Sequence, residues 1–273
     1  MTSLQLRSTA VSSTTDLRIE DVSVVFNLQG RDLVALESLT LEIPTGQTLA
    51  LVGPSGCGKT TLLNVIAGFI QPTTGRVLVG GEPVRGPSSQ RSVVFQADAV
   101  FPWLSVRENL KYGPRIRREF DDAARERVER YLEMMGLTAF AGEYPKVLSG
   151  GMRKRVDVAR VYVSDPSVVL LDEPFGALDD FTKSNLQDEL VKLKKIDPKT
   201  TVFVTHDIEE AIYVGDVVAV MAARPGRLQE VIEVPLSPDR EAAVKDSDEF
   251  QELRQHIQRL LRRTMADAAE EAA

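Results

Sequence analysis

One eight-residue segment restricts the fold of this chain more than any other part of the sequence. In Gly53-Pro-Ser-Gly-Cys-Gly-Lys59-Thr60, two glycines separated by four residues are followed by a lysine and a hydroxyl residue. The apolar run from Gly46 to Val52 precedes it and is short enough for a buried strand, and an apolar-rich helix is expected from Thr61. Glycines let the backbone curl so that its N–H groups face phosphate oxygens. The segment therefore predicts a phosphate-binding loop between a strand and a helix.

The side chains of this loop have separate expected roles. Lys59 is expected to reach the β- and γ-phosphates of a nucleotide, and Thr60 to bind Mg²⁺. The helix that begins at Thr61 points its positive end at the same anion. A chance match to the pattern is the alternative, and the strand-loop-helix setting argues against it. The expected nucleotide contacts of the loop are Gly53, Pro54, Ser55, Gly56, Cys57, Gly58, Lys59, Thr60 and Thr61.

The overall composition is that of an ordinary globular protein, with 43% hydrophobic and 27% charged residues. A net charge of −7 argues against nucleic acid as a partner, because no basic excess can displace counterions from phosphate. Cys57 is the one cysteine, so no disulfide framework is expected. No apolar run is long enough to span a bilayer, and the Ser/Thr-rich residues 1–15 lack the apolar core of a signal peptide. We expect a disordered tail there.

Alternating and apolar runs between turn residues predict the strands of the fold. Arg/Glu-rich segments with helical spacing, such as residues 121–135, occupy the stretch 97–165. The amphipathic helix Phe181–Lys195 lies between two apolar runs, an alternation that implies a mostly parallel sheet. The predicted strands are Leu17–Phe26 and Leu39–Ile43, which belong to an antiparallel edge, and then Arg76–Val79, Arg91–Gln96, Ser167–Asp172 and Thr201–Thr205.

Together these signals predict an α/β fold: a P-loop NTPase core with a mostly parallel sheet, an antiparallel β edge and an inserted helical subdomain. The expected domain is 16–235, with its core in 16–96 and 166–235 and its helical subdomain in 97–165, followed by a helical extension at 236–273. In that extension one helical face carries Phe250, Leu253, Ile257, Leu260 and Leu261. We interpret it as a docking helix, with contact at a membrane surface as the alternative.

Polar residues follow two of the predicted apolar strands. Asp172 and Glu173 come at the end of Val168–Leu171, and His206 follows Thr201–Thr205. Open α/β sheets bind their ligands at such strand ends. Asp172 is expected to hold Mg²⁺ through water, Glu173 to accept a proton from an attacking water, and His206 to sense the γ-phosphate. A solvated strand terminus and a structural histidine are the alternatives.

Two further motifs resemble those of one family. Leu148-Ser-Gly-Gly151-Met and Ala177-Leu-Asp179 are similar to the signature motif and the following loop of the nucleotide-binding subunits of ATP-binding cassette (ABC) transporters, over residues 17–234. Ordinary phosphate-loop kinases and GTPases lack this signature. The resemblance implies a Mg-ATP hydrolase in which two subunits pair head to tail and share each ATP. The residues that would serve the partner's ATP are Ser149, Gly150, Gly151 and Asp179.

The resemblance also implies roles for Phe26 and Gln96. Phe26 stands where the family stacks adenine on an aromatic ring, and a core aromatic of a strand is the alternative. Gln96 resembles the glutamine that contacts Mg²⁺ and the attacking water, so it joins Glu173 and His206 as an expected catalytic residue. The implied magnesium ligands are Thr60, Gln96 and Asp172.

The stretch from Val100 to Leu110 resembles the part of importer subunits that grips the membrane permease. The expected contact lies near Phe101 and Trp103, the single tryptophan, and an ordinary buried cluster is the alternative. Other segments resemble nitrate, sulfonate and taurine importers, which implies a peripheral location on the cytoplasmic membrane face. The expected partners are a permease, a second cassette subunit and, indirectly, a solute-binding protein, with no nucleic acid.

Two other functions remain open within the same family. An exporter or lipid-transfer complex is one, and a non-transport ATPase acting in DNA repair or translation is the other. Asp157 departs from the family pattern, which has a small apolar residue there, and we consider that it pairs with an arginine of the permease or partner. The C-terminal domain of sugar-type importers is not seen, so we expect no regulatory ligand.

Overall fold

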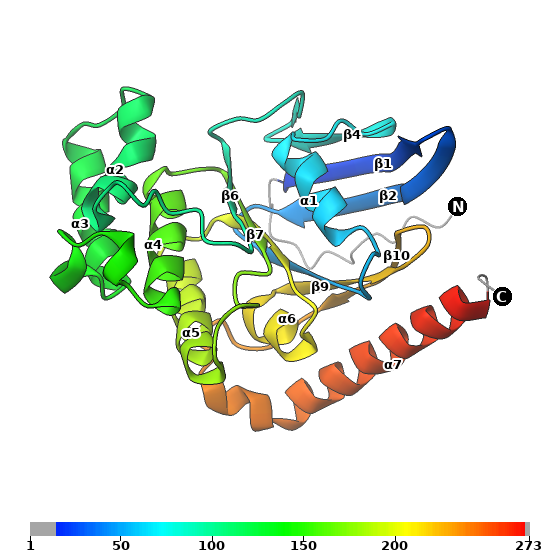
Figure 1. Cartoon of the computed structure of the whole chain (residues 1–273). Coiled ribbons are helices and arrows are strands. Elements are labelled where there is room, and N and C mark those ends of the chain that lie inside the picture. The colour runs from blue at the N-terminus through cyan, green and yellow to red at the C-terminus, as the bar shows by residue number, and fades with distance from the viewer. Residues whose placement is uncertain (1–14, 271–273) are drawn as a thin grey trace.

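The computed structural model describes residues 15–270, and it gives an α/β fold built on two sheets (Figure 1). Of the expected tail at 1–15, residues 1–14 lie outside the described part, and Thr15 begins the first strand. The expected fold class is confirmed by the strand order and by the helices around it. The domain boundaries at 16–235 and 236–273 stay a prediction.

The larger sheet has six strands in the order β10-β9-β3-β8-β7-β6. Neighbours are parallel from β9 to β6, and β10 pairs antiparallel with β9 at the edge. This order is a doubly wound arrangement, which brings the carboxyl ends of β3, β6, β7 and β8 to one edge. The strands are β3 (Thr48–Val52), β6 (Arg91–Val94), β7 (Val168–Asp172), β8 (Thr200–Val204), β9 (Val217–Ala222) and β10 (Arg227–Glu233).

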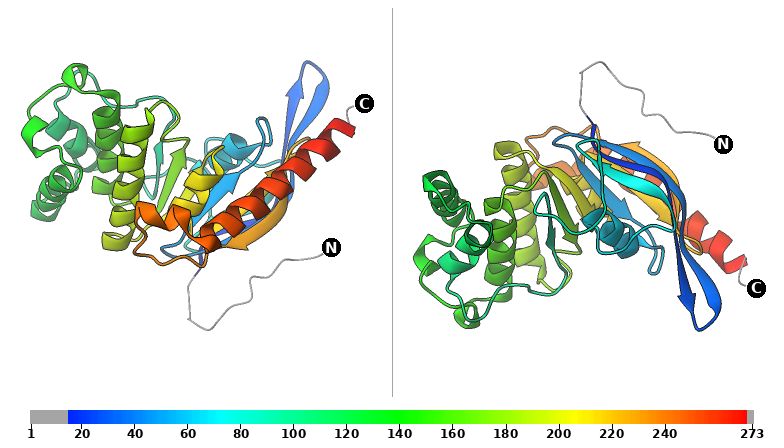
Figure 2. Two further views of the ribbon diagram at one scale, coloured as in Figure 1. Left: turned by 90° about the horizontal axis from the view of Figure 1, so that it is seen from below. Right: turned by 90° about the horizontal axis from the view of Figure 1, so that it is seen from above.

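The predicted antiparallel strands form a separate four-stranded sheet, in the order β2-β1-β4-β5. Its long hairpin is β1 (Thr15–Leu28) and β2 (Arg31–Pro44), and β4 (Thr74–Val79) and β5 (Glu82–Pro83) complete it. The hairpin is longer than either predicted strand, because cross-strand pairing continues through residues 25–28 and 31–34 to a solvent-exposed tip where apolar and polar residues do not alternate. Figure 2 shows this sheet beside helix α1 (Lys59–Ala67).

The helical segment predicted at 97–165 contains three α-helices. They are α2 (Val106–Ile116), α3 (Asp122–Met134) and α4 (Gly150–Val163), with the short 3₁₀ turns η1 (Thr138–Phe140) and η2 (Pro145–Val147) between the last two. The remaining helices are α5 (Asp180–Ile196), α6 (Ile208–Val214) and α7 (Asp248–Glu270), and the turn η3 (Ala242–Asp246) precedes α7. Figure 1 shows α2, α3 and α4 to one side of the larger sheet.

Side chains of the central strands alternate between the two faces of the sheet, and this alternation divides the core into two clusters. In β3, Leu49 and Leu51 belong to the cluster shared with α1 and the smaller sheet, whereas Ala50 and Val52 belong to the cluster shared with α4, α5 and α6. Strand β7 divides its side chains in the same way. Since both faces of a parallel sheet are covered, all five residues of β3 are buried. The rigid sheet can therefore hold the loops at its edge in fixed positions.

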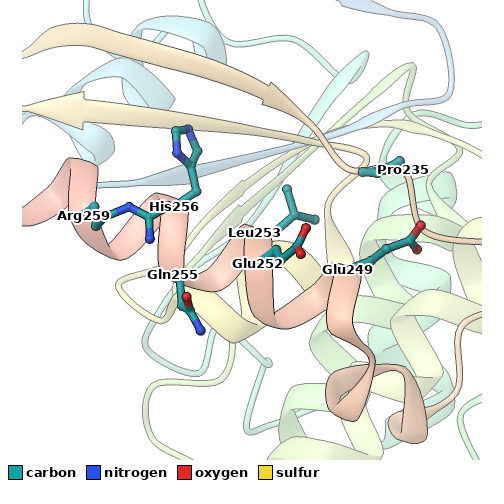
Figure 3. A pocket seen from close by; sticks show the side chains of 7 residues that line it. All are labelled: Pro235, Glu249, Glu252, Leu253, Gln255, His256 and Arg259. Atoms are coloured by element: carbon teal, nitrogen blue, oxygen red, sulfur yellow. The ribbon is translucent and has the colours of Figure 1, made fainter.

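Helix α7 packs on its own chain. Its predicted apolar face is confirmed, because Phe250, Ile257 and Leu260 are buried in the main core, and Leu253 and Leu261 pack against it. The helix lies along α6 and β9 (Figure 1). A groove of about 420 Å³ lies between α7 and Pro235; its other lining residues are Glu249, Glu252, Leu253, Gln255, His256 and Arg259 (Figure 3). None of these residues belongs to the predicted nucleotide site.

Across residues 15–270, no helix has the length and apolar character needed to cross a membrane.

Candidate functional site

The phosphate loop connects β3 to α1 as predicted, and its glycines have a steric reason. Gly56 and Gly58 have φ values of 79° and 88°, in the left-handed region that only glycine occupies freely. A Cβ on Gly53 would lie 2.6 Å from Sγ of Cys57 and 2.8 Å from the carbonyl oxygen of Met221. Only glycine therefore fits the start of the loop. Helix α1 begins at Lys59, two residues earlier than predicted.

Lys59 folds back over the loop and is only 7% exposed. Its Nζ donates hydrogen bonds to the carbonyl oxygens of Gly53, at 2.8 Å, and Pro54, at 3.2 Å. Cys57 is fully buried beside it, and burial raises the pKa of the thiol although the Lys59 ammonium lowers it. The ammonium thus lies at the loop's centre, where it can exchange these carbonyls for phosphate oxygens.

Thr60 and Asp172 come together across 112 residues of sequence. The Thr60 hydroxyl donates to Oδ1 of Asp172 at 3.3 Å, which joins the first turn of α1 to the end of β7. Burial raises the pKa of the Asp172 carboxyl, although the hydrogen bond from Thr60 lowers it. A hydroxyl and a carboxylate oxygen side by side are hard donors of the kind that Mg²⁺ binds.

Glu173, His206 and Gln96 meet at the neighbouring strand ends. Oε2 of Glu173 lies 3.1 Å from Nδ1 of His206. The amide of Glu173 donates to the carbonyl oxygen of Val204 at 3.0 Å, so the ends of β7 and β8 are joined directly. A Cβ on Gly176 would lie 3.7 Å from both Oε2 of Glu173 and Nε2 of Gln96, so these two side chains approach the same point beside Gly176.

Gln96, His206 and Glu173 all lie beyond the ends of their strands. Gln96 and His206 were predicted at strand ends, but β6 ends at Val94 and β8 at Val204, so both lie two residues past their strands and are exposed. Glu173 has a φ of 43°, uncommon for a residue with a side chain. Such a conformation is kept only where the surrounding structure requires it, and here it accompanies the turn from β7 toward the site.

The signature residues lie elsewhere in the chain. Ser149 is the N-cap of α4, and its hydroxyl accepts a hydrogen bond from the Met152 amide at 3.3 Å. Asp179 caps α5 in the same way, accepting from the Thr182 amide at 3.0 Å. A Cβ on Gly151 would lie 2.3 Å from Cγ2 of Thr182, so the two helix starts are packed together. Figure 1 shows α4 and α1 on opposite sides of β6 and β7, so this group does not join Lys59 within one chain.

Phe26 occupies an intermediate position. It lies in β1, is partly buried, and packs against the core cluster that contains α1. Both expectations for Phe26, a core aromatic and a stacking platform for adenine, fit a ring that is covered on one side and open on the other.

The aromatic stretch after Gln96 is not an ordinary buried cluster. Trp103 is 69% exposed, although its ring lies 5.6 Å from that of Phe101. Phe101 is held more firmly, with the Tyr112 ring at 4.3 Å and the Arg160 guanidinium 4.8 Å from its ring. An exposed tryptophan on an anchored neighbour is typical of an interface residue.

The expectation that Asp157 pairs with an arginine of another protein is wrong. Its side chain is fully buried, and Oδ1 accepts from Nη2 of Arg160 in its own helix at 2.7 Å. Oδ2 accepts from the Ala99 amide at 3.1 Å. Lys154, on the same helix, is also buried and was not predicted to have a role. A signal was available, because these charged residues recur every third position on a helix face otherwise occupied by valine and alanine.

Known proteins are similar to this chain over most of its length. A family model described as "ABC transporter" matches residues 36–176. A taurine import ATP-binding protein, TauB, of Jannaschia sp. is 42% identical over 248 residues, which is 89% of this chain and 92% of the relative. An aliphatic sulfonates import ATP-binding protein, SsuB, of Bacillus cereus is 41% identical over 239 residues, 88% of this chain and 93% of the relative.

Solved structures give the same result for the fold. An ATP-binding cassette, determined as a dimer in a post-hydrolysis state with ADP and Pi bound, has a TM-score of 0.69 and 28% identity. The match covers 100% of that cassette chain and 81% of this chain. The expected family, fold class and ATPase class are confirmed by these matches. The chain belongs to the ABC transporter family, as one of its ATP-binding proteins.

Proposed function

We propose that this chain is the ATP-hydrolysing subunit of a membrane importer for a small solute, working as a dimer around two Mg-ATP. The observation that carries the proposal is the meeting of Thr60, Asp172, Glu173 and His206 beside the phosphate loop, through contacts of 3.3 Å and 3.1 Å. These groups come from the first turn of α1 and from the carboxyl ends of β7 and β8, at the sheet edge where open α/β sheets bind nucleotides.

The residues present fit a magnesium ion. Thr60 supplies a hydroxyl, Asp172 a carboxylate and Gln96 an amide oxygen, all hard oxygen donors. Burial of Asp172 disfavours its charge, and a bound cation would relieve that cost. When bound, Mg²⁺ supplies neutralisation of the charge that develops between the β- and γ-phosphates.

The positions of the side chains support the following catalytic roles. Lys59 neutralises the phosphates after leaving the carbonyls of Gly53 and Pro54. Glu173 accepts a proton from the attacking water, and Gln96, which approaches the same point beside Gly176, orients that water. His206 contacts Oε2 of Glu173 and holds that carboxylate in place beside the γ-phosphate.

A second subunit completes each site. Ser149, Gly150 and Gly151 begin a helix whose first N–H groups can bind phosphate, yet α4 and α1 lie on opposite sides of β6 and β7 (Figure 1). The motif is therefore placed to act on the ATP held by a partner, and Asp179 begins the neighbouring helix on the same side. Solved relatives that are dimeric cassettes support this arrangement.

The exposure of Trp103 and the anchoring of Phe101 support a permease contact at these two residues. Curated relatives named as taurine and aliphatic sulfonate import proteins support an importer, a small sulfonate-like or related anionic solute, and a solute-binding protein on the far side of the membrane. The subunit then works peripherally, on the cytoplasmic face. A role in an exporter or lipid-transfer complex is the second candidate, favoured by no particular contact.

The decisive experiment measures ATP hydrolysis by the chain with its co-purified permease in vesicles. Small sulfonates, nitrate and amines are added one at a time with the cognate binding protein. Stimulation by one solute, together with its uptake into vesicles, is the expected result. Co-purification with ribosomes or DNA ends, or ATP-driven outward transport, would contradict the importer assignment.

A further inference from the structure

The signature helix is fastened to the chain segment that follows β6. Lys154 of α4 is 2% exposed, and its Nζ donates to the carbonyl oxygens of Phe95 at 2.9 Å and Gln96 at 3.1 Å. Arg153, next to it, forms a 2.7 Å ion pair with Asp98. The backbone on both sides of the expected catalytic glutamine is thus held by the helix that Ser149 begins.

Asp157 continues the attachment one helical turn further. Its carboxylate accepts from the Ala99 amide, and Arg160, which it also binds, donates from Nη1 to the Ala99 carbonyl at 2.7 Å. Both backbone groups of Ala99 are therefore bonded to α4. Because the Asp157 side chain is fully buried, its charge is tolerated only while these partners stay in place. These bonds leave α4 little freedom to shift relative to the segment around Ala99.

The far end of the segment is held by a different helix. Asn109 of α2 is fully buried, accepts from the Phe101 amide at 2.7 Å and donates to its carbonyl at 3.1 Å. The Arg160 guanidinium also stacks over the Phe101 ring, at 4.8 Å. Hydrogen bonds thus join Gln96 and Ala99 to the signature helix, and Phe101 is linked to that helix through the Arg160 guanidinium and to α2 through Asn109.

We propose that Lys154 and Asp157 are positioning residues that make α4 and residues 95–101 move as one body, so that nucleotide binding at Gln96 is transmitted to Trp103. The inference rests on the proposed function, and it deepens it by naming the link between the ATP site and the permease surface. Coupling needs a physical element that both sites bias, and buried hydrogen bonds to consecutive backbone groups supply one.

The test uses Trp103 itself, because it is the only tryptophan in the chain. Acrylamide quenching of its fluorescence is measured on the full chain, with and without Mg²⁺ and a non-hydrolysable ATP analogue. The variants are Asp157→Ala and Lys154→Met. Arg155→Ala is the matched control, because Arg155 lies on the same helix and forms a 2.7 Å ion pair with Glu189 of α5, away from the segment.

We expect the analogue to change Trp103 quenching in the wild-type chain and in Arg155→Ala. Asp157→Ala and Lys154→Met should keep the analogue's Kd within about twofold but lose more than about half of the quenching change. Asp157→Asn, which retains one acceptor oxygen, should fall between. Far-UV circular dichroism and the Kd itself show whether each variant is folded, and Lys154→Met keeps the aliphatic part of the side chain in the core.

Three results would overturn the inference, and the first two are a full quenching response in both Asp157→Ala and Lys154→Met, or a wild-type chain that binds the analogue without any Trp103 response. An equal loss in Arg155→Ala would also overturn it, since the effect would then belong to the helix in general. A wild-type chain that binds no nucleotide would refute the proposed function instead, so the two failures are distinguishable.

Discussion

Nδ1 of His206 lies 3.1 Å from Oε2 of Glu173, across the ends of two parallel neighbouring strands. The backbone repeats this connection, because the Glu173 amide donates to the carbonyl oxygen of Val204. The two side chains are thus held by the sheet itself, in which β8 is buried throughout and β7 is buried from Val168 to Leu171. A carboxylate fixed by a histidine beside a phosphate loop is suited to receive a proton from water in a defined direction.

Replacing the Glu173 carboxylate should separate ATP binding from ATP hydrolysis. We expect Glu173→Gln to bind ATP normally and to lower kcat by about 10²–10⁴-fold, because the amide cannot accept the proton. Single-turnover hydrolysis with labelled ATP measures the rate, and size-exclusion chromatography with Mg-ATP should show a trapped dimer. The control is Glu230→Gln, since Glu230 also contacts a histidine, His256 at 2.8 Å, but outside the site. Wild-type turnover in Glu173→Gln would refute its catalytic role.

Lys59→Ala should weaken nucleotide binding by more than about tenfold, because it removes the cation at the centre of the loop. The variant should remain folded, since Lys59 binds only loop carbonyls and a weak sulfur acceptor. Calorimetric titration with ATP gives the Kd, and Lys195→Ala, which removes an exposed lysine, controls for net charge. An unchanged Kd would rule out the assigned phosphate contact.

Asp172→Asn should make the free chain more stable at neutral pH while abolishing magnesium-dependent turnover. Burial raises the pKa of Asp172 in the folded state. Between the ordinary carboxyl pKa and this raised value, the unfolded chain releases its proton first, so rising pH lowers the stability of the wild-type protein. The asparagine variant lacks this loss. Its Tm advantage should therefore be present at pH 7 and shrink toward pH 4, as thermal unfolding can measure, and a constant difference would contradict the explanation.

Mixed dimers test whether the site is shared. Lys59→Ala disables one half of a site and Ser149→Leu, at an exposed position, disables the other half. Each variant alone should be inactive, whereas an equal mixture should recover about a quarter of the wild-type activity, since half of the dimers keep one intact site. ATPase assays against mixing ratio measure this. Absence of recovery, with dimers confirmed by ultracentrifugation, would exclude a site made by two subunits.

Trp103→Ala should leave ATP hydrolysis by the isolated subunit unchanged, because the side chain is 69% exposed and lies outside the site. In the complex it should weaken permease binding, because a large buried aromatic at an interface contributes more than about 1 kcal/mol. Pull-down of the permease and solute-stimulated hydrolysis are the measurements. Tyr144→Ala, at another exposed aromatic, is the control. Equal permease binding by Trp103→Ala and Tyr144→Ala would show that the permease contact does not lie at Trp103.

The local parts of the site were predictable because their causes are local. The phosphate loop needs glycine at Gly56 and Gly58 because their positive φ values are a requirement of the local backbone, and the apolar runs of β3, β7 and β8 reflect burial on both faces. The residues at which the strands end were less predictable from the sequence. Gln96 and His206 lie two residues past their strands, since strand boundaries depend on pairing with neighbours.

Asp157 shows where prediction from sequence fails. Its charge and its place behind the signature motif suggested a partner in another protein, but its partners are Arg160 and the backbone of Ala99. Residues 99 and 157 are far apart in sequence, and only the packing of α4 against the segment after β6 brings them together. Periodicity identifies which face of a helix is covered, and it does not identify what covers it.

The sequence by itself determined the phosphate loop, the buried strands, the helical insertion and the family, because glycine spacing, apolar periodicity and short motifs act over a few residues. Only the tertiary structure decided that Thr60 meets Asp172, that Glu173 meets His206, and that the signature helix is bonded to both sides of Gln96. Those contacts depend on the strand order of the larger sheet and on how α4 packs beside it, which are set by burial summed over the whole chain.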